Sequence, residues 1–282
     1  MALVERRGYA LPARRLGELC FGGPVAEGEV LAAVASSPSL RLMHGLVIGP
    51  DLVPAAPAIA SRARTHQEQA DAHLAATLRF VRALVRVNPH ILGVAVAGSL
   101  ASGGFVESDD VDLNLLVEDG HRHLAYVTLN TLGVLHALRH RGKPVDAHTR
   151  RPLAPRFMTA NLILERSQYL PLVRHDAAMA YELLCSRPVF GIRHWRELVA
   201  ENPALVGHFP QLREWPDDGV SLERPLSLPR WLFPSWADGP ARALGSAGWR
   251  WMQWTRRGDG EARARVAFVR DTMRPYALFD DR

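Results

Sequence analysis

Apolar side chains recur at helical spacing between residues 62 and 87. Four of them follow one another at intervals of four, three and four residues, which places them on one face of a helix. The sequence Asn88-Pro89 ends this pattern, because proline disfavours helical geometry in the residue before it. We therefore expect a long amphipathic helix whose core-facing stripe consists of Leu74, Leu78, Val81 and Val85.

Two apolar runs after this helix predict neighbouring strands. Ile91–Val96 is continuously apolar, as in a strand covered on both faces, and Val111–Val117 alternates enough to lie beside it. Residues 98–104 between them are rich in glycine and predict a turn. A helix is expected over 123–141, with Gly142 as its C-terminal stop. Its predicted buried side holds Leu124, Val127, Val134, Leu135 and Leu138.

Shorter patterns predict the remaining elements of a central unit. Val145–His148 and Asn161–Leu164 are candidate third and fourth strands, and Ala177–Leu184 lies in a helix that ends at Arg187-Pro188. Strands mixed with helices indicate a mixed α/β fold class with a small sheet. We expect three parts, which are a helical module at 1–60, a core at 61–190 and a helical lobe at 191–282.

The first and last parts each allow a nucleic-acid interpretation. Residues 16–53 read as helix, turn, helix and hairpin, which resembles a winged-helix unit, but the second helix has few basic residues, so a packing role is favoured. All seven tryptophans lie at or beyond Trp195. Three of them stand beside arginines and could stack on nucleic-acid bases. The favoured interpretation is that they pack in the core of a small helical lobe. These neighbours are Trp249, Trp251 and Trp254 with Arg250, Arg256 and Arg257.

Composition is that of a globular chain. It has 282 residues, of which 48% are hydrophobic and 22% are charged, and its net charge of +5 is too mild to demand a polynucleotide partner. Cys20 and Cys185 are too few and too distant for a disulfide framework or a zinc site, which favours a reducing cytoplasm. We expect no secretory signal, because no apolar run follows the charges of the N-terminus. We also expect no membrane span, because the longest uncharged stretch, Ile91–Val106, is interrupted by glycines. The oligomeric state stays open.

Candidate chemistry lies where the two predicted strands meet. Asp110 and Asp112 are separated by one residue, and strand side chains alternate, so both carboxylates are expected on one face. Such a pair can bind Mg²⁺ or Mn²⁺ together with the phosphates of a nucleotide. Gly98 lets the main chain approach a phosphate closely, and the Ser99 hydroxyl can donate to its oxygens.

Residues 97–113 resemble the signature of the DNA polymerase β-like nucleotidyltransferases. The segment has Gly-Ser, a small residue and a glycine, followed by Ser-Asp-Asp-Val-Asp-Leu, with Asp109 as one acidic residue more than the pattern contains. The resemblance implies a mixed α/β core with a short sheet and Asp110 and Asp112 as metal ligands. It also implies that Gly98, Ser99 and Ser108 bind the nucleotide. Similarity to bacterial stand-alone members of the superfamily extends over residues 16–191.

The resemblance also implies a third carboxylate on a later strand, which binds metal and activates the acceptor. Asp146 is the favoured residue and Glu165 is its competitor, whereas Asn161 would be an incomplete ligand. Without a third carboxylate, a catalytically inactive relative becomes credible. The twelve histidines, His121 and His148 among them, show no metal-ligand spacing, so satisfied or exposed side chains are expected, with His148 beside Asp146 as the exception to test.

The expected reaction follows from this resemblance. An enzyme would transfer a nucleoside monophosphate from a nucleoside triphosphate to a hydroxyl or phosphate of a small-molecule acceptor and release pyrophosphate. Three alternatives stay open: an enzyme that acts on RNA or tRNA, an inactive nucleotide-binding or regulatory relative, and a winged-helix DNA binder. Nucleic acid is the less favoured partner of the enzyme.

Overall fold

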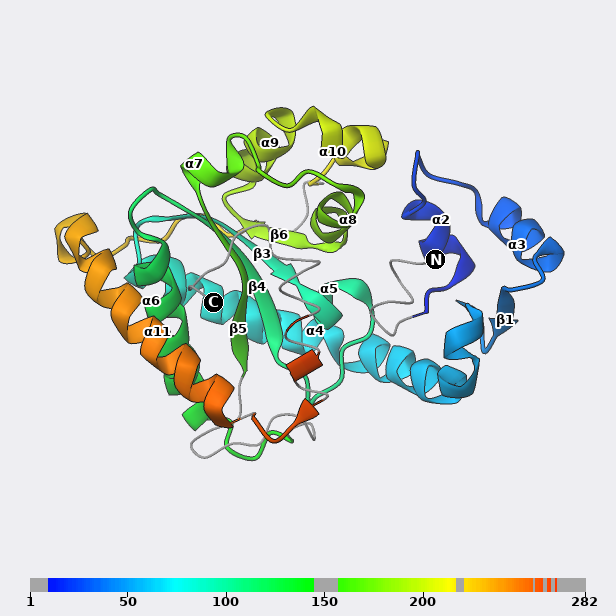
Figure 1. Cartoon of the computed structure of the whole chain (residues 1–282), viewed down its shortest axis with the longest axis horizontal. Coiled ribbons are helices and arrows are strands. Elements are labelled where there is room, and N and C mark those ends of the chain that lie inside the picture. Colours follow the sequence, from blue (N-terminus) through cyan, green and yellow to red (C-terminus); the bar gives the residue numbers. More distant parts are fainter. Residues whose placement is uncertain are drawn as a thin grey trace.

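The N-terminal part of the molecule has the predicted order of two helices and a hairpin. The computed structural model describes residues 10–144, 157–216 and 221–255, with isolated positions between 257 and 267. Figure 1 shows this part beside the larger core. Its elements are α2 (Ala13–Glu18), α3 (Glu27–Ser36), β1 (Arg41–Met43), β2 (Leu46–Ile48) and the 3-10 helix η1 (Pro50–Ala55).

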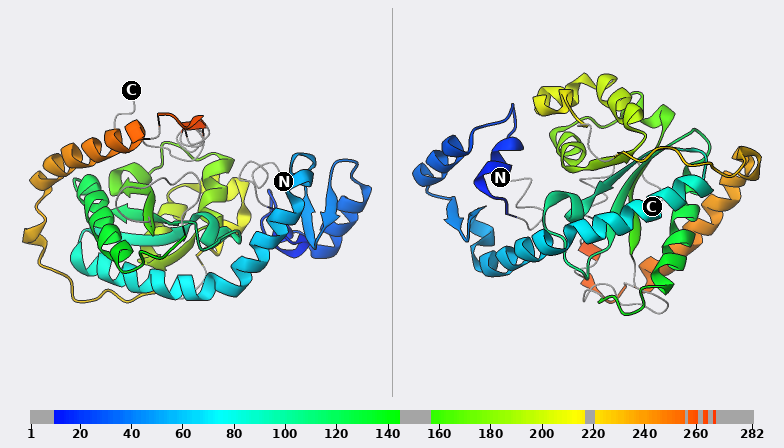
Figure 2. Two further views of the ribbon diagram at one scale, coloured as in Figure 1. Left: turned by 90° about the horizontal axis from the view of Figure 1, so that it is seen from below. Right: turned by 180° about the vertical axis from the view of Figure 1, so that it is seen from behind.

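The long helix α4 (Ala56–Val87) joins the N-terminal part to the core, and the right view of Figure 2 shows it crossing in front of the sheet. It begins earlier than expected because Pro57 is suited to a first helical turn. Val81 and Val85 are fully buried, as the apolar stripe predicts. The helix ends at Val87, and its C-cap Asn88 is extended, as the following proline predicts.

Four strands form a mixed sheet in the order β5-β4-β3-β6. β3 (Ile91–Ala97) pairs antiparallel with β4 (Val111–Val117), and the register places Ile91 opposite Val117 and Ala97 opposite Asp112. β4 pairs parallel with β5 (Met158–Glu165). β3 pairs antiparallel with β6 (Arg187–Phe190). The mixed α/β class is therefore confirmed. The β3–β4 pair has one end at Ile91 and Val117 and the other at Ala97 and Asp112.

Helices cover both faces of the sheet. α4 and α6 (Arg122–Leu138) bury one face, to which Val111, Leu113 and Leu115 of β4 contribute. α8 (Ala177–Cys185) and α9 (Ile192–Ala200) bury the other face, with Leu116 in the same core. Because strand side chains alternate, Asp112 and Asn114 belong to the α8 side.

The predicted buried side of α6 is wrong. Ala125, Leu129 and Ala137 are buried, whereas Val134 and Leu135 are 53% and 55% exposed. The buried side of the helix therefore combines Leu129 with small residues such as Ala125 and Ala137. α6 also ends at Leu138, before the expected stop at Gly142.

Two further expectations need correction. Residues Gly98–Ser102 form the short helix α5 instead of a turn. Helix α8 ends at Cys185, and Arg187–Phe190 is strand β6, because Pro188 lies in an edge strand, where a missing N–H is tolerated. The expected strand at Val145–His148 lies outside the described residues.

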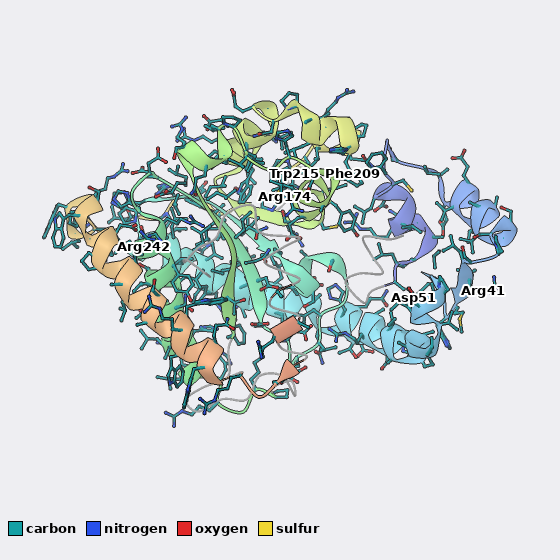
Figure 3. The ribbon with its side chains drawn as sticks, in the orientation of Figure 1. Arg41, Asp51, Arg174, Phe209, Trp215 and Arg242 are labelled. Atoms are coloured by element: carbon teal, nitrogen blue, oxygen red, sulfur yellow. The ribbon has the colours of Figure 1, made fainter. Side chains whose placement is uncertain are left out.

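Helices beyond β6 pack on the sheet. Trp195 of α9 is fully buried in the core that contains Leu116. Trp215 donates from its indole nitrogen to the Ser186 carbonyl (3.2 Å), and Figure 3 shows it near Phe209 on the α8–α10 side. The smaller elements here are α7 (Arg166–Tyr169), α10 (Pro203–His208) and η2 (Pro210–Arg213).

The last described helix, α11 (Asp238–Thr255), packs along α6. Asp238 accepts from the Leu124 amide (2.8 Å) and lies 2.7 Å from Nδ1 of His123, so it caps the α6 N-terminus. Trp251 and Trp254 are 50% and 57% exposed, more than packing in the core of a lobe predicts. The 3-10 helices η3 (Arg230–Leu232) and η4 (Ser235–Ala237) precede α11. Within the described chain, no helix has the length and apolar character needed to span a bilayer.

Candidate functional site

Gly98 lies against the carboxylate of Asp112 where β3 ends. Its φ is +62°, a left-handed conformation that glycine adopts without steric cost. A Cβ at this position would lie 2.2 Å from Oδ2 of Asp112, far inside van der Waals contact. Glycine is thus required here both by the backbone conformation and by the space that the carboxylate occupies.

The Asp112 carboxylate is also oriented from the neighbouring strand. Thr159, its register partner on β5, donates to Oδ1 at 2.8 Å. Asp110 is partly buried and precedes the first residue of β4. The alignment of the Asp110 and Asp112 side chains on one face therefore stays a prediction.

Asp109, the additional acidic residue, helps to attach the loop between β3 and β4 to helix α4. Its Oδ2 forms an ion pair with Arg62 at 2.8 Å. Arg62 also donates to the Gly104 carbonyl at 2.9 Å, which ties the loop to α4. Nearby, Nδ1 of His66 accepts from the Phe105 amide at 3.2 Å. The α4 helix thus holds the connection between β3 and β4 at several points.

The predicted nucleotide-binding serines occupy the same connection. Ser99 is buried within α5, and its carbonyl accepts from the Gly103 and Gly104 amides. Ser102 donates to the Gly98 carbonyl at 2.8 Å and fixes the start of this short helix. Ser108 is partly buried in the loop before Asp110. The structure therefore brings Gly98 and Asp112 into contact and gives Ser99 little exposed surface.

The alternative third carboxylate, Glu165, is on the wrong end of the sheet. It is the last residue of β5, opposite Val117, and its Oε1 accepts from the Gly120 amide at 2.8 Å. Because β5 runs parallel to β4, its C-terminal end lies away from Asp112. The favoured residue, Asp146, and its neighbour His148 lie outside the described residues.

A buried polar network, which the sequence did not reveal, lies on the same side of the sheet as Asp112. Nδ2 of Asn161 is 2.9 Å from Oδ1 of Asn114 and 3.0 Å from Oε1 of Glu182. Asn114 is fully buried and Glu182 is 3% exposed. Asn161 is therefore a structural hydrogen-bond donor to a buried carboxylate. The sequence signal for this network was the presence of polar residues, Asn114 and Glu182, inside the apolar runs of β4 and α8.

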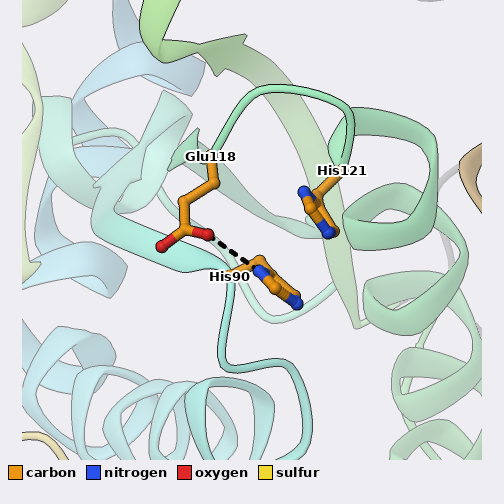
Figure 4. A group of neighbouring side chains, drawn as sticks. All are labelled: His90, Glu118 and His121. Carbon is orange, nitrogen blue, oxygen red and sulfur yellow. Dashed lines mark hydrogen bonds and ion pairs between the residues drawn. The ribbon is translucent and has the colours of Figure 1, made fainter. Parts of the chain in front are cut away.

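A second cluster lies at the opposite end of the β3–β4 pair. One ligand atom from each of His90, Glu118 and His121 lies within 4.8 Å of the others. Nδ1 of His90 is 2.9 Å from Oε2 of Glu118, and the two imidazole rings stack with centroids 3.6 Å apart (Figure 4). Six residue steps of about 3.3 Å put this cluster about 20 Å from Asp112.

Glu118 is the anionic centre of this second cluster. Burial favours the neutral acid, but hydrogen bonds from His90 and Arg230 outweigh it and hold the pKa of the Glu118 carboxyl below its usual value. The cluster was missed because its members are distant in sequence and lack a familiar spacing. The antiparallel register of the structure brings them together, because it places the residue before Ile91 beside the residue after Val117.

Comparisons of the chain with known protein families, with curated proteins and with solved structures found no match. The mixed α/β architecture and the two clusters are therefore described from this chain alone.

Proposed function

We propose that the chain is a metal-dependent nucleotidyltransferase with a polymerase β-type core. It would transfer a nucleoside monophosphate from a nucleoside triphosphate to a hydroxyl or phosphate of a small molecule and release pyrophosphate. The observation that carries this proposal is the packing of Gly98 against the Asp112 carboxylate. This contact joins the Gly-Ser and Asp-x-Asp portions of the motif in one place.

The donor set at this end of the sheet suits a hard divalent cation. Asp110 and Asp112 supply carboxylate oxygens, the ligands that Mg²⁺ and Mn²⁺ prefer. Such an ion, when bound, would neutralise charge on the triphosphate and on the leaving pyrophosphate. The chain's own residues contribute in two ways. Thr159 orients the Asp112 carboxylate, and Gly98, which has no side chain, leaves room for it.

Asp146 is our proposed third carboxylate, which would hold the metal and take the proton from the acceptor hydroxyl. Two described residues that flank its segment contact the Asp110 region. The Lys143 ammonium donates to the Asp109 carbonyl, and the Phe157 carbonyl accepts from the Val111 amide at 2.9 Å. Asp146 follows Lys143 by three residues, a span of about 11 Å at most.

An inactive nucleotide-binding relative is the second candidate, and one observation favours it. The β5 residue opposite Asp112 is Thr159, and the next polar residue, Asn161, is engaged with Asn114 and Glu182. Neither is a carboxylate, so turnover depends on Asp146. Such a relative would bind nucleotide with Mg²⁺ and release no pyrophosphate.

Calorimetry and an activity assay together separate these candidates. Each nucleoside triphosphate is titrated into the full chain with Mg²⁺, with Mn²⁺ and with neither. The same protein is then incubated with a metabolite extract, with detection of pyrophosphate and of the nucleotidylated product by mass. Metal-dependent binding with pyrophosphate release supports the enzyme, and binding alone supports the inactive relative. Failure of every nucleotide to bind would reject both.

A further inference from the structure

The cluster at the far end of the β3–β4 pair combines burial with chemistry suited to a softer metal than Mg²⁺. His90 precedes β3, Glu118 follows β4, and His121 immediately precedes α6. His90 and His121 are 6% and 7% exposed. Two imidazoles and a carboxylate are a donor set typical of zinc and related transition metals.

One nitrogen of His90 lacks a partner despite its burial. Nδ1 lies 2.9 Å from the Glu118 carboxylate, which only accepts, and 3.5 Å from the Arg230 guanidinium, which only donates. The shorter contact favours the proton on Nδ1 of the neutral ring, which leaves the lone pair on Nε2. Nε2 is buried and makes no hydrogen bond within the described part of the molecule. Leaving a buried acceptor unsatisfied is unfavourable, and a metal ion is one group that would satisfy it.

Both ring nitrogens of His121 lie beside hydrogen-bond acceptors. Its Nδ1 lies 2.9 Å from the Asp119 carbonyl, and its Nε2 lies 3.2 Å from the Phe233 carbonyl. Both carbonyls accept, whereas a neutral imidazole donates from one nitrogen only. Donation from Nδ1 to a carbonyl is the usual orientation of a metal-ligating histidine, and it leaves Nε2 for the ion.

We propose that His90, Glu118 and His121 form a binding site for a zinc-class transition metal, distinct from the proposed Asp110–Asp112 magnesium site. Arg230 donates to Oε1 of Glu118, which matches the hydrogen bonding expected of a ligating carboxylate and leaves Oε2 on the side of His90. A water molecule would complete four ligands.

Binding requires a local rotation of the rings. The imidazole planes differ by only 15°, whereas a metal lies in the plane of each ring that ligates it. Ligand atoms within 4.8 Å of one another must close to about 3.4 Å for bonds of about 2.1 Å. Turning His121 away from the stack and from the Phe233 carbonyl frees its Nε2 for the ion. The His90 ring must turn as well, because Nδ1 and not Nε2 faces Oε2 of Glu118.

The bound ion would link three segments that are distant in sequence. His90 immediately precedes β3, and Glu118 and His121 belong to the connection from β4 to α6. Arg230 and Phe233 belong to the segment that leads to α11. Ion binding is therefore expected to raise the thermal stability of the whole chain, independently of any nucleotide.

The direct test is a titration of the metal-free full chain with ZnCl₂ in excess MgCl₂, with Co²⁺ absorption as a second readout. We expect one zinc ion at this site, a tetrahedral Co²⁺ spectrum and a rise in Tm of roughly 5 °C at a hundredfold excess over Kd. An unchanged Tm together with the spectrum of hydrated Co²⁺ would overturn the assignment.

Variants locate the ion. His121→Gln and Glu118→Gln should each weaken Zn²⁺ binding by at least about tenfold, with circular dichroism used to verify folding. The matched control is His194→Gln, because His194 is a buried histidine 3.3 Å from a carboxylate of Glu197 but belongs to no three-residue cluster among the described residues. Zinc affinity equal to wild type in His121→Gln would contradict the site.

The two proposed metal sites can fail separately. Asp112→Asn should leave Zn²⁺ binding unchanged, because the clusters lie at opposite ends of the strand pair. Loss of zinc binding in Asp112→Asn would assign the ion to the carboxylate end and overturn the histidine site. If the wild-type chain binds Zn²⁺ but no nucleoside triphosphate, the proposed function is rejected and the histidine site is retained.

Discussion

The two ends of the β3–β4 pair differ in how their residues are assembled. At one end, Gly98 and Asp112 lie at the two ends of a single connection between adjacent strands. At the other, His90 and Glu118 meet through the strand register, and Arg230 arrives from a segment more than a hundred residues later. A motif whose residues are close in sequence can be recognised from the sequence. A site that depends on the strand register and on a segment distant in sequence cannot.

The largest expected effect comes from the carboxylates. Asp110→Asn and Asp112→Asn each remove a charged metal ligand, and pyrophosphate release should fall about a thousandfold, equivalent to roughly 4 kcal/mol of transition-state stabilisation. Asp109→Asn is the matched control, because Asp109 pairs with Arg62 and should affect stability more than turnover. Near-normal pyrophosphate release in both ligand variants would end the enzyme proposal.

Glycine substitutions test the backbone of the same end. In Gly98→Ala the new Cβ meets Asp112 at 2.2 Å and φ is +62°, so the free energy of unfolding should fall by about 3 kcal/mol. Gly103→Ala is the control, because φ is +95° there but the Cβ meets open space, and the loss should be about 1 kcal/mol. Urea denaturation measures both. Equal losses would show that the Asp112 contact is unimportant.

A smaller effect is expected from the buried network beside the carboxylate end. Asn161→Leu removes the donor to Asn114 and Glu182, and the free energy of unfolding should fall by about 2 kcal/mol because two buried acceptors lose a partner. Asn130→Leu, which removes only a bond to the Tyr126 carbonyl on partly exposed α6, should change it by about 0.5 kcal/mol. Indistinguishable denaturation midpoints would contradict this ranking.

The smallest effect is a pH dependence at the loop near Phe105. Burial lowers the pKa of the His66 imidazole from its ordinary 6.5, and the nearby Asp71 only partly offsets this. The unfolded chain therefore takes up this proton more readily, so the contribution of His66 is present above pH 6.5 and is lost as the pH falls below that value.

His66→Asn keeps an acceptor for the Phe105 amide but does not titrate. Between pH 7.5 and 5.5, wild type should therefore lose more stability than His66→Asn, by about 1 kcal/mol or less, as measured from Tm. The same loss in both proteins would assign the pH dependence to other groups.

Much of the core was predictable because its signals are periodic and local. The α4 stripe and the continuous apolar run of β3 follow from spacing alone. β6 was missed because Pro188 was interpreted as a helix stop, although an edge strand tolerates it. The rotation of α6 was missed because its buried side includes small residues beside Leu129, whereas the large apolar residues Val134 and Leu135 are exposed.

Prediction of the site divides in the same way. Gly98 and Asp112 meet as the motif implies, whereas Glu165 fails because the parallel direction of β5 was not deducible from its own residues. The Asn161–Glu182 contact and the histidine cluster depend on how strands and helices are placed in space. Asp146 stays a prediction.

The cap on α6 has a consequence for how the chain is made. The Leu124 amide is satisfied by Asp238, 114 residues later, and no side chain at the start of α6 replaces it. During synthesis, α6 and its neighbouring strands leave the ribosome long before this acceptor exists. The N-terminal turn of α6 should therefore become protected from amide exchange only after α11 has been translated and docked.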